Sequence, residues 1–125
     1  MNATRLVRYS LWTTAPLNVV AAYMLAFPGS ALGRLFDLPA SVPGIYAGLV
    51  SFLVLMFGGV YAWLASRPEI DRPLLAIGAI GKGGVFVVTL CVWLAGASSG
   101  RTVLIGAGDL AFASLWAWWL IDTPR

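Results

Sequence analysis

Residues 74–97 read LLAIGAIGKGGVFVVTLCVWLAGA, and this stretch decides the fold of the chain. Its only charged residue is Lys82. An α-helix rises about 1.5 Å per residue, so roughly 20 apolar residues cross the ~30 Å hydrocarbon core of a bilayer. The run lacks the in/out alternation that a membrane-barrel strand needs. We therefore predict that this stretch is a transmembrane helix.

Three more runs have the same character. Residues 9–27 and 43–65 carry no charge, and residues 102–121 carry only Asp109. Together the four runs predict an all-α fold, a transmembrane four-helix bundle that forms a single integral membrane domain over residues 1–125. The sequence shows no clear internal repeat.

The composition supports a membrane location. Hydrophobic residues make up 60% of the chain and charged residues only 10%, against about 25% charged in a typical soluble domain. A soluble domain of this size buries only about two thirds of the surface that its unfolded chain exposes, too little to hide so many apolar side chains. Disordered chains are poor in apolar residues, so disorder is excluded as well.

The connectors between the runs are short. Residues 30–38 place apolar and charged side chains at helical spacing, which predicts a short interfacial helix between the first and second transmembrane helices. Residues 98–101 form a minimal turn, which predicts that the third and fourth transmembrane helices are an antiparallel hairpin.

The arginines in the connectors and tails predict the orientation. With four crossings, one side of the membrane carries Arg5, Arg8, Arg67, Arg72 and Arg125, whereas the other side carries Arg34 and Arg101. Cytoplasmic loops are enriched in Lys and Arg. We therefore predict a multi-pass protein of the bacterial inner (plasma) membrane with its N- and C-termini in the cytoplasm.

Aromatic residues gather near the predicted cytoplasmic ends of the helices, where amphipathic rings favour the membrane interface. They are Tyr9, Trp12, Tyr61, Trp63, Trp116, Trp118 and Trp119. We predict that they form an anchoring belt.

Several kinds of chemistry are excluded by what the sequence lacks. It contains no histidine, and its single cysteine, Cys91, cannot form an internal disulfide or a cysteine metal cage. The net charge of +3 comes from scattered basic residues, which is not a nucleic-acid signature. We expect no cofactor, no metal and no nucleic-acid partner.

Polar residues inside the runs are the candidates for function. Lys82 and Asp109 have opposite charges on adjacent helices, and Asn18 is the one amide in the first helix. A charged side chain near the bilayer centre costs about 2.5–3.5 kcal/mol on insertion scales, so such residues face the bundle interior and find partners. We predict a mid-membrane cluster of Asn18, Lys82 and Asp109.

The depths of the two charges leave their contact open. Counted from the cytoplasmic helix ends, Lys82 and Asp109 differ in depth by about 6 Å, but counted from the hairpin turn they differ by about 12 Å. A direct contact fits the smaller difference, and a bridging water or hydroxyl fits the larger. Two roles stay open as well: an ion pair that fixes the helix register, or a site that binds a ligand or handles protons.

Small residues at helical spacing predict close helix packing. They are Gly44 and Gly48 in the second run, and Gly78, Gly81 and Gly84 in the third.

Two short motifs, Gly81-Lys82 and Gly108-Asp109-Leu110, together with the layout of four helices, are similar to those of small bacterial inner-membrane proteins of the DoxX-like type. The resemblance covers the whole chain. It implies a four-helix membrane bundle and no particular activity.

These observations favour a non-enzymatic membrane bundle that acts through helix contacts, as a homo-oligomer or as a subunit of a larger membrane complex. Its partners are then the lipid bilayer and other membrane helices. The alternative is a small-molecule carrier or ion pathway centred on Asn18, Lys82 and Asp109. A membrane enzyme ranks third, because only Asp109 with Lys82 offers an acid/base pair.

Overall fold

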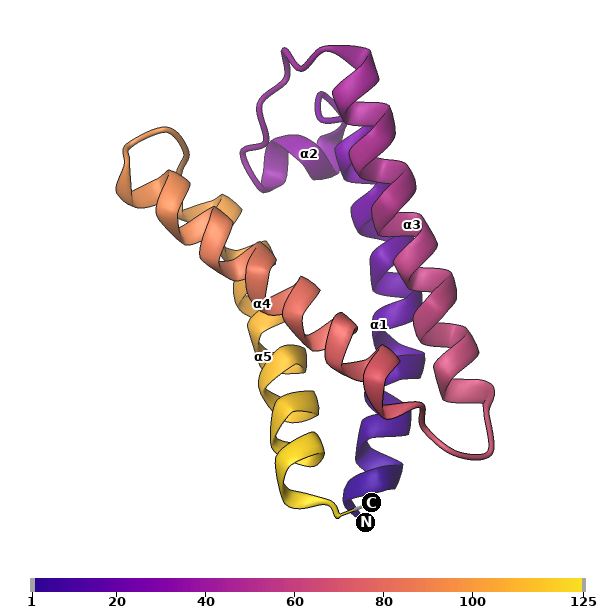
Figure 1. Cartoon of the computed structure of the whole chain (residues 1–125). Coiled ribbons are helices and arrows are strands. Elements are labelled where there is room, and N and C mark those ends of the chain that lie inside the picture. The colour runs from indigo at the N-terminus through magenta and orange to yellow at the C-terminus, as the bar shows by residue number, and fades with distance from the viewer. Residues whose placement is uncertain (1, 125) are drawn as a thin grey trace.

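The fold is all-α, as the sequence predicts. A computed structural model describes residues 2–124, so Arg125, which was counted in the charge bias, lies outside the described residues. Within them the chain forms five helices and no strand (Figure 1). The helices are α1 (Ala3–Ala26), α2 (Ala31–Leu35), α3 (Gly44–Ser66), α4 (Arg72–Leu94) and α5 (Gly100–Asp122). The short α2 lies where the sequence predicts a short helix.

Three of the four long helices, α3, α4 and α5, are long and apolar enough to cross a membrane. The fourth long helix, α1, is not among them. Polar side chains on α1, including Ser10, Thr14 and Asn18, lower its hydropathy. The buried positions of α1 include these three side chains, which therefore face the rest of the protein.

The long helices form two antiparallel pairs. In Figure 1, α1 packs along α3 on the right and α4 packs along α5 on the left, and these two contacts are the most extensive in the molecule. The pairs meet near the end that holds both termini and diverge towards the end that holds α2. The predicted hairpin of the third and fourth long helices is therefore present.

The core lies where the two pairs meet. Its fully buried side chains include Val7, Leu11, Leu64, Leu75 and Trp116, contributed by all four long helices. These side chains hold the two pairs together at this end through close van der Waals packing.

Three of the aromatic residues expected in an anchoring belt belong to this core instead. Tyr61, Trp116 and Trp119 are buried. The indole nitrogens of the two tryptophans donate to hydroxyls of α1: Trp116 Nε1 to Ser10 Oγ (2.8 Å) and Trp119 Nε1 to Thr4 Oγ1 (3.2 Å). A buried indole needs such a hydrogen-bond acceptor, and the sequence pattern does not show that α1 supplies one.

Glycines mark the close contacts between helices, and only one of them is among the glycines named from the sequence pattern. A methyl group at Gly58 would meet Asn18 Cβ at 2.9 Å, and one at Gly106 would meet Phe86 Cα at 2.9 Å. Of the predicted packing glycines, Gly78 lies against Tyr61. The remaining four have open space at the Cβ position and so pack against no other described helix of this chain: Gly44, Gly48, Gly81 and Gly84. Small residues permit close packing, but they do not choose which helix face is used.

The end opposite the termini is held by the segment after α2. Asp37 adopts a left-handed conformation (φ 57°) and closes α2, with the Leu38 N–H donating to the Gly33 carbonyl at 2.9 Å. From there the chain reaches α5, where the Thr102 hydroxyl donates to the Phe36 carbonyl at 2.9 Å. The α2 segment therefore bridges the two helix pairs at the end where they diverge.

A polar cluster between the helix pairs

The three polar residues singled out in the sequence lie together where the two helix pairs meet. Lys82 Nζ donates to Asp109 Oδ1 at 2.8 Å and to Asn18 Oδ1 at 3.4 Å. Lys82 and Asp109 therefore make a direct ion pair within the second helix pair, and Asn18 joins it from the first.

The actual helix ends explain why the direct contact forms. The sequence placed the hairpin turn between residues 97 and 102, whereas α4 ends at Leu94 and α5 begins at Gly100. Counted from these ends, Lys82 and Asp109 differ in depth by three residues, or about 4.5 Å. A lysine side chain spans that difference. The glycine cap at Gly96 (φ 79°), which ends α4 early, accounts for most of the correction.

Hydrogen bonds to both polar atoms of its amide hold the Asn18 side chain in place. Its Oδ1 accepts from Lys82, and its Nδ2 donates to the Val54 carbonyl of α3 at 2.9 Å. The absence of a side chain at Gly58 lets α3 approach the Asn18 Cβ this closely. The amide can therefore bridge the two helix pairs without leaving either of its polar atoms unpaired.

Three aromatic rings surround the Lys82 ammonium. Its Nζ lies 5.2 Å from the ring centroid of Tyr61, 5.4 Å from Phe112 and 6.0 Å from Trp116. These distances allow cation–π attraction, which is strongest for a desolvated ammonium. The sequence pattern alone does not reveal this role, although Phe112 and Trp116 follow Asp109 by three and seven residues and so share its helix face.

The two charges differ in accessibility. The Lys82 side chain is 5% exposed, whereas the Asp109 side chain is 24% exposed. The carboxylate is therefore the member of the pair that a ligand or proton reaches first. An acid and a base in hydrogen-bond contact can pass a proton between them.

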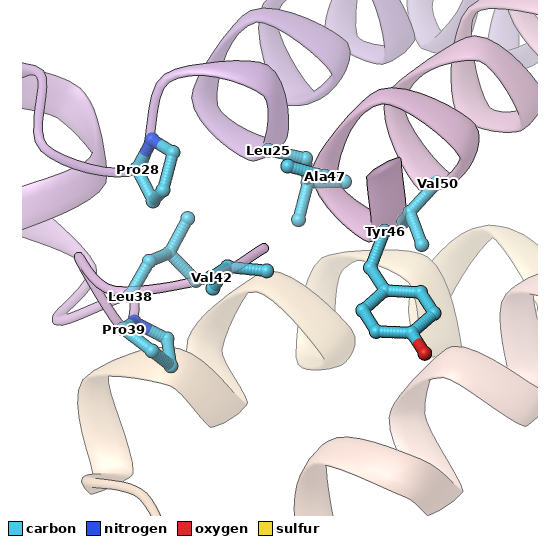
Figure 2. Close-up of a pocket in the computed structure, with 8 residues that line it drawn as sticks. All are labelled: Leu25, Pro28, Leu38, Pro39, Val42, Tyr46, Ala47 and Val50. Carbon is cyan, nitrogen blue, oxygen red and sulfur yellow. The ribbon is translucent and has the colours of Figure 1, made fainter. Parts of the chain in front are cut away.

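A separate groove of about 120 Å³ lies near the α2 end, lined by the end of α1, the connector after α2 and the start of α3 (Figure 2). Its walls include Leu25, Pro39 and Val42, and the Tyr46 hydroxyl is the one polar side-chain group among the lining residues. Asn18, Lys82 and Asp109 do not line it. The groove and the polar cluster are therefore separate features.

The part of the chain that the structure describes contains no group of three or more His, Cys, Asp or Glu side chains placed to hold a metal ion. Comparisons with protein-family models, with curated proteins and with solved structures found no match to this chain.

Proposed function

We propose that this chain is a small multi-pass protein of the bacterial inner membrane, a single domain in which all four long helices cross the bilayer. The three apolar helices support three crossings, and the antiparallel packing of α1 along α3 supports the fourth. Four crossings place both termini on one side, and the arginine bias favours the cytoplasm. The resemblance to DoxX-like proteins remains a prediction that agrees with this arrangement.

The topology has a direct test. A reporter that works only in the cytoplasm should be active when it is fused to either terminus. A reporter that works only outside the inner membrane should be active when it is inserted in the turn after Ala97. Four crossings would be contradicted if the cytoplasmic reporter were active only at one terminus and the other reporter only at the opposite terminus.

We further propose that the protein is a non-enzymatic bundle that acts through contacts of its helices, either with a second copy or with another membrane protein. One observation carries this proposal. The side chains of Asn18, Lys82 and Asp109 are engaged in internal hydrogen bonds, while α3 and α4 present open glycines outward, at Gly44, Gly48, Gly81 and Gly84. Open glycines let the backbone of another helix approach closely, which drives helix association in lipid.

The measurement is the oligomeric state in lipid nanodiscs or mild detergent, by light scattering or cross-linking. The variant Gly84→Leu should lower the fraction of oligomer, because the added side chain blocks close approach. Ile80→Leu, a volume-conserving change at another exposed position of α4, is the matched control and should leave that fraction unchanged. A wild-type chain that stays monomeric at high protein-to-lipid ratio would rule out self-association.

A carrier or ion pathway is the second candidate, and the exposure of Asp109 favours it. In that case, liposomes that contain the protein should show a proton or small-ion flux that Asp109→Asn removes. Asp37→Asn, which changes an acid at the membrane edge, should leave the flux unchanged. Flux equal to that of empty liposomes would remove this candidate.

A further inference from the structure

The two helix pairs are capped by arginines in the same way. Arg8, near the start of α1, donates to carbonyls at the end of α3, and Arg72, at the start of α4, donates to carbonyls at the end of α5. The acceptors that correspond between the pairs are the carbonyls of Ala65 and Pro68 in the first pair and those of Leu120 and Thr123 in the second. Each acceptor of the second pair lies 55 residues after its counterpart in the first.

Aromatic residues repeat at the same spacing and with the same geometry. Phe57 and Tyr61 of α3 have ring centroids 6.1 Å apart and ring planes inclined by 41°. Phe112 and Trp116 of α5 have centroids 6.0 Å apart and the same inclination of 41°. Helical spacing brings residues four apart together in any helix, so what repeats here is the pair of aromatic residues at matched positions.

The environments of matched residues also agree. Leu11 of α1 and Leu75 of α4, separated by 64 residues as Arg8 and Arg72 are, are both 0% exposed. Trp63 of α3 and Trp118 of α5 are 50% and 49% exposed.

With α3 and α5 aligned at this spacing, five positions are identical. They are Leu49 and Leu104, Leu55 and Leu110, Phe57 and Phe112, Ala62 and Ala117, and Trp63 and Trp118. The spacing between the first helices of the pairs, 64 residues, differs from 55 because the connector that contains α2 is longer than the turn between α4 and α5. A search for a repeat of one fixed period therefore does not reveal it.

Matched residues meet one another between the pairs. Asn18 and Lys82 occupy matched positions on α1 and α4, and Lys82 Nζ lies 3.4 Å from Asn18 Oδ1. Tyr61 and Trp116 occupy matched positions on α3 and α5, and their ring centroids are 5.2 Å apart. Equivalent residues contact each other only at a two-fold axis.

We infer that the chain is built from two equivalent two-helix units, α1 with α3 and α4 with α5, related by a pseudo-two-fold axis that runs between Asn18 and Lys82. The face that each unit presents to the other is the kind of surface that fits a second copy of the same unit. The polar cluster then lies on the axis, and both units contribute to it.

At the axis the two units differ in chemistry at two pairs of matched positions, 18/82 and 54/109. Lys82 bonds the Asp109 side chain of its own unit, whereas Asn18 bonds the backbone carbonyl of Val54, and Val54 matches Asp109. Because the matched positions 18 and 82 face each other, two lysines there would repel. The Lys–Asp pair can therefore lie in either unit, but not in both.

The experiment moves the charge pair across the axis in the full-length protein. The variant Asn18→Lys/Val54→Asp/Lys82→Asn/Asp109→Val should melt in detergent within about 5 °C of the wild type. The same variant without Val54→Asp leaves the lysine at position 18 without a carboxylate, and its melting temperature should be at least about 10 °C lower. A third variant, which carries Ser51→Asp in place of Val54→Asp, tests whether the position of the acid matters.

Equal melting of the variants with and without Val54→Asp would overturn the inference, and so would equal rescue by Ser51→Asp. A milder variant, Lys82→Asn/Asp109→Val, makes the two units alike at the axis and introduces no charge. It should melt within about 5 °C of the wild type, because an amide at position 82 can bond the carbonyl of position 109 as Asn18 bonds Val54. A loss of more than about 10 °C in this variant would also overturn the inference.

Discussion

The two helix pairs differ in the polar contact that joins their helices near the middle of the molecule. In the first pair, Asn18 bonds a backbone carbonyl at 2.9 Å, and in the second, Lys82 bonds the Asp109 carboxylate at 2.8 Å. A backbone carbonyl is present whatever the side chain, so no substitution on α3 can delete the acceptor. A carboxylate can be lost by one substitution, and its partner is then a buried unpaired charge. The second pair is therefore the more vulnerable of the two.

The largest effect should come from breaking the ion pair on one side only. Lys82→Met leaves Asp109 without its cation and should lower the free energy of unfolding by about 3–5 kcal/mol. Lys82→Met combined with Asp109→Leu removes both charges and should lose clearly less. The measurement is chemical or thermal unfolding in detergent. Equal losses from the single and the double variant would show that the two residues are not coupled.

The corresponding substitution in the first helix pair is at Asn18. Asn18→Ala should cost about 1–2 kcal/mol, because it removes one hydrogen bond between neutral groups and one long (3.4 Å) bond from the Lys82 ammonium, and it leaves Lys82 with its carboxylate. If Asn18→Ala destabilised the protein as much as Lys82→Met, the second pair would not be the more vulnerable to substitution.

The next largest loss in free energy of unfolding should come from methyl groups added at the close helix contacts. Gly106→Ala brings a methyl against the Phe86 backbone, which cannot move without shifting α4, and should cost about 1–3 kcal/mol. Gly58→Ala meets Asn18 Cβ, which is fixed to the α1 backbone, and the Ala15 carbonyl, so it should cost a similar amount. Gly81→Ala has open space and should be neutral or slightly stabilising, because alanine favours a helix by up to about 1 kcal/mol over glycine. Thermal unfolding of the three variants would rank them, and the opposite order would contradict the packing described above.

Removing either arginine cap should lower the free energy of unfolding by a smaller amount, nearly equal in the two pairs. Arg8→Ala and Arg72→Ala each leave carbonyls at a helix C-terminus without their donor, at the partly exposed end of the molecule. We expect each to cost about 1–2 kcal/mol. A loss more than twice as large in one variant as in the other would weaken the equivalence of the two caps.

The smallest effect is expected at Thr14. Its Oγ1 is buried and has no hydrogen-bond partner among the described residues. Thr14→Val keeps the shape and removes the unpaired hydroxyl, so the free energy of unfolding should stay within about 0.5 kcal/mol of the wild type or rise. A loss of more than about 1 kcal/mol would show that the hydroxyl has a partner in lipid, such as a buried water.

Much of the fold could be predicted from the sequence because the signals are long and local. Four apolar runs give the long helices to within a few residues at most ends, and charged residues interrupt the runs only at Lys82 and Asp109. Opposite charges in an apolar environment have few alternatives to each other, which is why the members of the polar cluster could be named in advance.

The remainder depends on which faces of the helices meet. The distance between Lys82 and Asp109 depended on where α4 ends, and Gly96 fixes that end through a backbone conformation that composition does not reveal. The aromatic residues near the helix ends include both exposed and buried members, and only packing separates Trp118 from Trp119. The open glycines show the same limit, because Gly78 and Gly81 look alike in the sequence and differ completely in contact.

The hydrogen bond between Trp119 and Thr4 ties the last turn of α5 to the start of α1, so these two helix ends are neighbours (Figure 1). A few added residues joining them would turn the chain into a ring. Cutting that ring at the connector between α3 and α4 would then give a circular permutant, in which the α4/α5 unit is made before the α1/α3 unit. If the two units are equivalent, the order of their synthesis should leave the finished fold unchanged.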